Sequence, residues 1–168
     1  MTVRLLARAV LVTVLGCGAC NAHGVRVVDD APLAPMGQYR SASVEVTADP
    51  NALKATPADE RFLAEDLENR LRKDAIFAEV RRGSADVKVR VRIVALGWAR
   101  AEGVSSDTPA EAKVVVTLVD AKTQRNVGVF TVHAKRGGLT PETDDNRALQ
   151  DAMRNASRAI VERLRRQR

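Results

Sequence analysis

Cysteine and aromatic residues are scarce in this chain. Its 168 residues include two cysteines, Cys17 and Cys20, and aromatic residues make up 3% of the total. Both cysteines precede the part that has folding patterns, so no disulfide is expected within the folded domain. The shortage of aromatic side chains favours a compact aliphatic core. It also argues against a large aromatic-lined ligand pocket.

The residue sets that most catalytic and metal sites need are also missing. The predicted domain holds one histidine, His133, and no cysteine, so it lacks the ligands of a typical zinc site. No Gly-x-Ser-x-Gly nucleophile motif occurs, and Gly137-Gly138 lacks the Lys and Ser/Thr of a phosphate-binding loop. We therefore expect no metal, no cofactor and no enzymatic activity.

No hydrophobic run is long enough to cross a bilayer, which takes about 20 apolar residues. The longest candidate covers residues 9–15 and follows Arg4 and Arg8. A short apolar run after positive charges is typical of a signal peptide, here residues 1–16. The run ends in Val14-Leu15-Gly16-Cys17, which resembles the lipobox of bacterial lipoproteins. That resemblance implies a diacylated Cys17 that anchors the chain in a membrane.

The residue after Cys17 is Gly18 rather than Asp. By resemblance to enterobacterial lipoproteins, this implies no inner-membrane retention signal, so we expect the outer membrane, on its periplasmic side. An alternative is ordinary signal-peptide cleavage after Ala22, with Cys20 and Ala22 as the small residues of the cleavage site. In that case the protein is free in the periplasm.

Basic residues moderately outnumber acidic residues in this chain. Without residues 1–16 the chain has 25 basic and 21 acidic residues. Export excludes nucleic acid as a natural partner, although a basic chain would otherwise suggest it. The expected partners are therefore the membrane, through the lipid anchor, and either an envelope protein or an anionic envelope polymer.

Two regions follow the signal peptide. Residues 17–40 contain Pro32 and Pro35 and show no sustained hydrophobic period, so they are predicted to be a lipidated N-terminus with a flexible linker. Residues 41–168 are predicted to form a single domain.

Hydrophobic periodicity predicts the elements of this domain. Thr56-Pro57 with Asp59 is typical of a helix start, and Leu63, Leu67 and Leu71 continue one apolar stripe to about Lys73. Alternating apolar residues predict strands at 43–47, 76–80, 86–98, 113–119 and 127–135, and a last helix begins near Thr143. The order β-α-β-β-β-β-α predicts an α+β two-layer sandwich, in which a four- to five-stranded mixed sheet carries both helices on one face.

The strand at 86–98 supplies the candidate binding face. Val87, Val89, Val91 and Ile93 alternate with Lys88, Arg90 and Arg92, so one set faces the helices and the other faces outward. Unbroken alternation also sends Leu96 and Trp98 outward. We therefore predict a face with Trp98 as anchor, formed by Lys88, Arg90, Arg92, Leu96 and Trp98. The alternative is that the strand bends or bulges near Ala95, so that Trp98 lies under the long loop at residues 99–111 and the cationic row is only a solubilising face.

Several of these residues also carry a resemblance. They are Leu71, Phe77, Val80, Ala85-Asp86-Val87 and the 114–120 strand with its Asp120-Ala121-x-Thr123 turn. The pattern resembles a diffuse group of proteobacterial lipoprotein domains, similar to the N-terminal domain of the Tol-system propeller protein and the curli-secretion lipoprotein. Gln124 stands where that turn usually has glycine. The resemblance implies an envelope-assembly role and supplies no functional residue.

Overall fold

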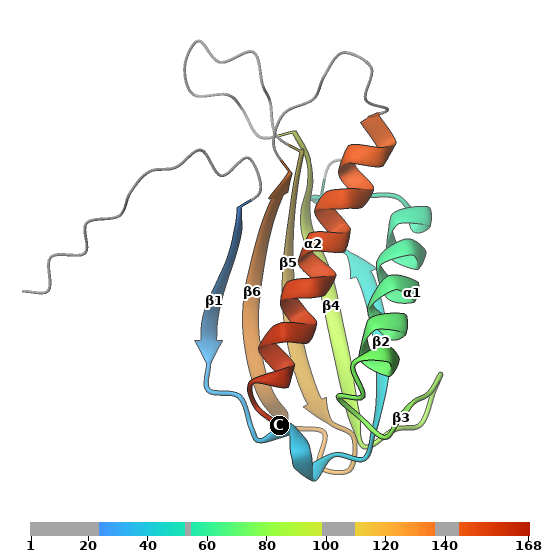
Figure 1. Cartoon of the computed structure of the whole chain (residues 1–168), viewed down its shortest axis with the longest axis vertical. Coiled ribbons are helices and arrows are strands. Elements are labelled where there is room, and N and C mark those ends of the chain that lie inside the picture. The colour runs from blue at the N-terminus through green and yellow to red at the C-terminus, as the bar shows by residue number, and fades with distance from the viewer. Residues whose placement is uncertain (1–23, 53–54, 99–109, 137–144) are drawn as a thin grey trace, which may run out of the picture.

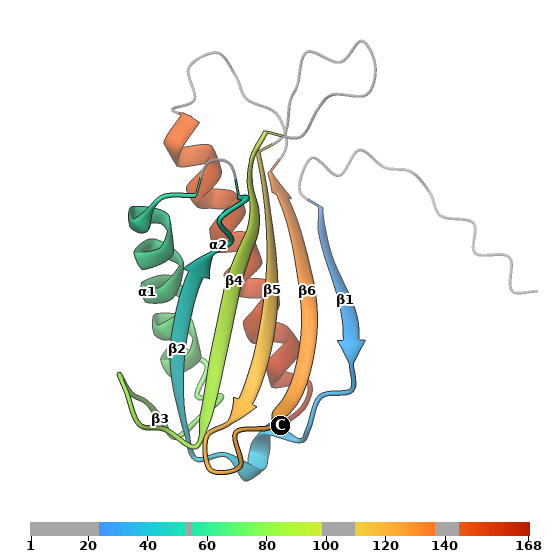
Figure 2. The same cartoon turned by 180° about the vertical axis from the view of Figure 1, so that it is seen from behind.

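A computed structural model describes residues 24–52, 55–98, 110–136 and 145–168. One layer is a six-stranded sheet and the other is a pair of helices, both on the same face of the sheet (Figures 1 and 2). The predicted α+β two-layer sandwich is therefore confirmed, with a larger sheet than expected. The predicted signal peptide, Cys17 and Ala22 lie outside the described residues. No helix of the described part is long and apolar enough to span a membrane.

The elements follow one another as β1 (Val25–Ala31), η1 (Met36–Gln38), β2 (Ser41–Ala48), α1 (Pro57–Lys73), β3 (Glu79–Val80), β4 (Val87–Trp98), β5 (Ala110–Asp120), β6 (Asn126–Arg136) and α2 (Asp145–Arg165). Across the sheet the strand order is β1-β6-β5-β4-β2-β3. Strand β2 runs parallel to β4 and β3, and the other neighbours are antiparallel. The sheet is thus mixed, with β1 at one edge and β2 with the short β3 at the other (Figure 2).

Helix α1 has the start that the sequence predicts. Thr56 accepts a hydrogen bond from the Asp59 N–H, and the Asp59 side chain accepts one from the Thr56 N–H. This reciprocal capping box satisfies two of the backbone donors that a helix start leaves free. The helix ends in a Schellman motif, in which Ile76 N–H donates to the Leu71 carbonyl and Ala75 has a φ of +49°.

The core lies between the two layers. Leu63, Leu67 and Leu71 of α1 are fully buried, as the apolar stripe predicts. From α2 the core receives Ala148, Ala152, Met153, Ala156, Ile160 and Leu164, and from the strands it receives chiefly valines. Burying this apolar surface supplies about 25 cal/mol per Å² and is the main force that holds the layers together.

The prediction of a flexible linker over residues 17–40 is wrong for its second half. Residues 25–31 form β1, which pairs antiparallel with β6. Leu33, Met36 and Tyr39 then pack into the core, and Met36 is fully buried. Pro32 and Pro35 turn the chain beneath the sheet, where Met36 N–H donates to the Gln167 carbonyl over 2.7 Å. Proline in this segment shapes a packed turn.

The predicted strand at 76–80 is also shorter than expected. Only Glu79 and Val80 pair, with the first two residues of β2. Ile76 and Phe77 are instead buried in the core below the end of α1. Their hydrophobicity reflects packing against the helices rather than membership of the sheet.

Candidate functional site

The face of the sheet opposite the helices carries the predicted cationic row. Lys88, Arg90 and Arg92 of β4 point to this open face, as the alternation predicts, and the two arginines are exposed. Glu45 of the neighbouring strand β2 pairs with two of them, at 3.7 Å from Lys88 Nζ and 3.0 Å from Arg90 Nε. The third, Arg92, lies 3.5 Å from an Asp49 carboxylate oxygen. Acidic side chains of the same molecule therefore offset much of the row's positive charge.

The outward placement of Leu96 and Trp98 is wrong. The pairing of β4 with β5 shifts register between Ile93 and Ala95, so the strand bulges at Val94. A bulge inserts one residue and reverses which side chains face the core. Leu96 is 5% exposed within the core, and Trp98 is partly buried against it. The bulge that the alternative placed near Ala95 is observed, whereas residues 99–109 of the loop that it placed over Trp98 lie outside the described residues. The candidate face therefore retains Lys88, Arg90 and Arg92 and loses its aromatic anchor.

Beside the cations, the open face is moderately apolar. Val115 and Val129 are half-buried on it, while Val116, Leu118 and Phe130 point into the core and Val127, at a register shift of β6, packs against the core. A shallow depression of about 470 Å³ crosses β2, β4, β5 and β6. It is lined by Glu45, Thr47, Arg90, Val91, Arg92, Val115, Thr117 and Asn126. The depression thus combines short polar, charged and β-branched side chains.

His133 lies on the same face, farther along β6. Its Nε2 atom is 3.1 Å from a carboxylate oxygen of Glu111, which also lies 3.9 Å from Lys135 Nζ. Within the described ranges no group of three or more His, Cys, Asp or Glu residues is arranged to hold a metal ion. Glu111 thus forms an ion pair with Lys135 and lies within hydrogen-bond distance of His133.

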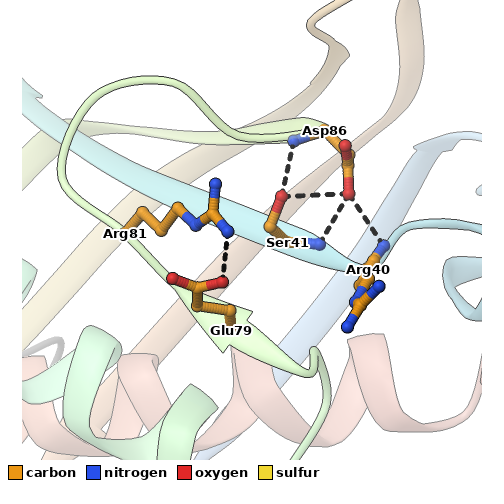
Figure 3. A network of polar contacts seen from close by, with 5 residues as sticks. All are labelled: Arg40, Ser41, Glu79, Arg81 and Asp86. Atoms are coloured by element: carbon orange, nitrogen blue, oxygen red, sulfur yellow. Dashed lines mark hydrogen bonds and ion pairs between the residues drawn. The ribbon is translucent and has the colours of Figure 1, made fainter.

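A tighter polar network ties the start of β2 to Asp86, the residue directly before β4 (Figure 3). One oxygen of Asp86 accepts hydrogen bonds from the N–H groups of Arg40 and Ser41 and from the Ser41 hydroxyl, at 3.0, 2.7 and 2.9 Å. The Asp86 N–H donates to Ser41 Oγ over 3.0 Å. The hydrogen bonds from Ser41, and then that from Arg40, lower the pKa of Asp86 below its ordinary value.

This network is structural in character. Parallel strands such as β2 and β4 have no hairpin turn to fix their register, and the Ser41–Asp86 contacts do so at their shared end. Nearby, Arg81 and Glu79 form an ion pair on the short strand segment (Figure 3). Sequence reasoning missed this link because its partners are 45 residues apart. The only signal was an aspartate directly before a strand.

Comparison with known proteins gives similarity in fold. No family model matches the sequence, and no curated protein matches it. Among solved structures, protein XCC0632 from Xanthomonas campestris, of the DUF330 family, aligns over 80% of this chain and 85% of its own length. Its TM-score is 0.58 at 16% identity. The PelC dodecamer from Paraburkholderia phytofirmans aligns over 84% of this chain and 96% of its own, with a TM-score of 0.52 at 17% identity.

A putative lipoprotein from Caulobacter crescentus aligns more weakly, over 72% of this chain and 86% of its own, at a TM-score of 0.47 and 20% identity. At these identities the two stronger alignments establish a shared fold and no shared activity. The resemblance to the Tol propeller and curli-secretion proteins stays a prediction.

Proposed function

We propose that this protein is a lipid-anchored, non-catalytic interaction module of the bacterial envelope, held at the outer membrane on its periplasmic side by Cys17. The observation that carries the proposal is a sheet face that no element of the described part covers, in a domain that begins only seven residues after the proposed anchor (Figure 2). An uncovered sheet face with half-buried valines is the kind of surface that binds partners.

The early start of the domain limits its reach. A linker extending to residue 40 would span about 75 Å when fully extended, whereas seven residues span about 25 Å at most. A domain on so short a tether stays beside the membrane surface. The proposal is therefore a module that contacts envelope components lying close to the membrane.

A protein is a better partner for the open face than an anionic polymer. The pairing of Lys88, Arg90 and Arg92 with Glu45 and Asp49 reduces the net charge that would attract a polyanion. Polymer binding through such a row weakens steeply as salt rises, because exposed charges are screened beyond about 8–10 Å at physiological ionic strength. We expect binding at this face to depend weakly on salt, and a steep dependence would favour the polymer instead.

The membrane anchor is tested by measuring the mass of the mature N-terminus from isolated membranes. We expect a Cys17 peptide carrying acyl chains, and we expect Cys17→Ser to move the protein to the soluble periplasmic fraction while the matched Cys20→Ser variant stays in the membrane. An unmodified mature chain beginning at His23 would contradict the anchor.

The interaction face is tested in intact cells by photo-cross-linking from Thr117, which lines the depression on the open face. The matched control carries the same photo-reactive residue at Lys122, in the exposed β5–β6 turn. We expect discrete cross-linked products from Thr117 and none from Lys122. Equal products, or none from either position, would contradict a partner on this face.

A further inference from the structure

Within the described residues, the two long edges of the sheet have backbone groups that no neighbouring strand takes up. There strand β1 pairs only with β6, and beyond its first two residues β2 pairs only with β4. Exposed edges of this kind pair with other strands unless the protein blocks them. The exposed large hydrophobic residues recorded for the described residues are Val25, Val27 and Val28, and all three lie on β1.

The hydrogen-bond pattern shows which groups β1 presents outward. Lys135 N–H donates to the Gly24 carbonyl over 2.7 Å. By the alternation of the strand, the backbone N–H and C=O groups of Arg26 and Val28 also point toward β6. The N–H and C=O groups of Val25 and Val27 therefore point to the free edge. Their side chains lie on the helix side, where with Ala159 of α2 they line a groove of about 330 Å³.

On the opposite edge, β2 presents an equivalent pair of residues. Ala42 accepts a hydrogen bond from Arg81 N–H, and Ala48 N–H donates to a Glu60 carboxylate oxygen over 2.6 Å. By the alternation of a strand, Val44 and Val46 between them also point their backbone groups to the free edge. Val44, with Ala64 of α1, lines a second groove of about 330 Å³ on the helix side.

We propose that the β1 edge of one copy of this chain pairs antiparallel with the β2 edge of a second copy. Strand β1 runs opposite to β2 within the sheet (Figure 1), so the joined sheet continues with both helix layers on the same side. The register that uses all four outward residues sets Val25 opposite Val46 and Val27 opposite Val44 of the second copy. It also brings the two helix-side grooves together.

Charge complementarity supports this register. Arg26 and Glu45 both lie on the open face. In the strand register, Arg26 lies opposite His133 of β6 and Glu45 lies opposite Arg90 of β4. In the proposed register Arg26 lies directly opposite Glu45 of the second copy. The two form a non-hydrogen-bonded pair, the type in which opposite side chains lie closest together. Arg26 is exposed and has no ion pair among those recorded in the described part, whereas Glu45 is half-exposed beside two cations of its own copy.

The ends of the two edges also match. Strand β3 occupies the edge of β2 at Ser41 and Ala42. In the proposed register β1 bulges between Asp29 and Ala31, at the level where it would otherwise meet β3 of the second copy. The pairing is therefore limited to residues 24–28 of one copy and 43–47 of the other. Because the two surfaces differ, such contacts repeat head to tail and give a closed ring or an open chain.

The test measures self-association of the full chain, purified from membranes in detergent, by sedimentation velocity over a range of concentrations. Arg26→Glu and Glu45→Arg each place like charges across the junction, and we expect each to weaken association by about tenfold. Mixing the two variants, or combining both changes in one chain, restores opposite charges and is expected to restore association. Lys122→Glu makes the same charge change as Arg26→Glu, but in the β5–β6 turn. It serves as the matched control and is expected to leave association unchanged.

A second measurement keeps the proposal testable if Glu45→Arg disturbs the fold. Val27→Pro removes an N–H that points to the free edge and no hydrogen bond to β6, so the variant is expected to fold and to remain monomeric. A folded wild-type chain that stays monomeric at every concentration would overturn the proposal. The proposal would also be overturned if Arg26→Glu weakens association and mixing it with the Glu45→Arg variant does not restore it. That result indicates that two identical edges pair with each other.

Discussion

Gly128 of β6 and Leu33 give a quantitative test of whether residues 32–40 belong to the folded domain. A Cβ atom at position 128 would lie 2.3 Å from Leu33 Cδ2 and 3.3 Å from Leu33 Cα. The first distance is far below van der Waals contact, so Gly128→Ala forces the Leu33 side chain out of its place. Overpacking of this kind costs about 1–3 kcal/mol of unfolding free energy.

The companion change removes the obstacle. Leu33 is 9% exposed, so Leu33→Ala loses buried area and is expected to cost about 2–3 kcal/mol, at the lower end of the range for buried leucines. Once Cδ2 is gone, an alanine at 128 meets only contacts near 3.3 Å, from Leu33 Cα and Leu118 Cδ1. The double variant is therefore expected to be at least about 1 kcal/mol more stable than the sum of the single effects predicts.

Urea denaturation followed by circular dichroism at 222 nm measures all four proteins of this cycle. Thermal melts give an independent reading, at about 2–4 °C per kcal/mol for a chain of this size. Two results would refute the reasoning: a neutral Leu33→Ala, or single effects that add without coupling. Either result would indicate that residues 32–40 belong to the flexible linker that the sequence predicts rather than to the packed domain.

Three further predictions concern single positions. Ala75→Gly is expected to raise the unfolding free energy by about 0.5–1 kcal/mol, because Ala75 holds a left-handed φ that glycine adopts without a Cβ penalty; Ala64→Gly inside α1 is expected to lower it, and the same urea titration compares them. Leu96→Ala is expected to cost about 2–4 kcal/mol, whereas Val115→Ala on the open face costs less than about 1 kcal/mol; equal losses would contradict the inward turn of Leu96. The lowered pKa of Asp86 means that its carboxylate stabilises the fold above its unfolded pKa near 4, and that this contribution is lost as the pH falls through the lower folded value. Asp86→Asn is therefore expected to flatten the loss of stability below pH 4 in denaturation titrations, and an unchanged slope would show that the Ser41 contacts do not favour the charged form.

The helix over residues 57–73 was predictable almost to the residue. Its signals are local: Thr56 and Asp59 cap it, Pro57 fits the first position, and the leucine stripe defines one buried face. The alternating part of β4 was predictable for the same reason, since Val87 to Ile93 alternate with three cations over a single element. Both predictions depend only on residues that are close together in the sequence and belong to one helix or one strand.

Two features were not predictable because they depend on distant partners. Strand β1 contains Asp29 and Asp30 and leads into Pro32, so locally it reads as a linker, and its strand conformation comes from pairing with β6 about 100 residues later. The direction of Leu96 depends on a bulge that the register with β5 creates. A single added residue reverses the faces of the strand, and the sequence left unbroken alternation and a bulge near Ala95 open as alternatives.

The sequence by itself determined both helices, the strands β2, β4, β5 and β6, the apolar faces of the helices, the inward set of valines and the row of cations on β4, because these follow from periodicity and capping within short segments. Only the tertiary structure decided that β1 completes the sheet, that Glu45 and Asp49 offset the cationic row, and that Trp98 turns inward. Each of these depends on which strand lies beside which, and strand pairing is set by contacts between residues far apart in the chain.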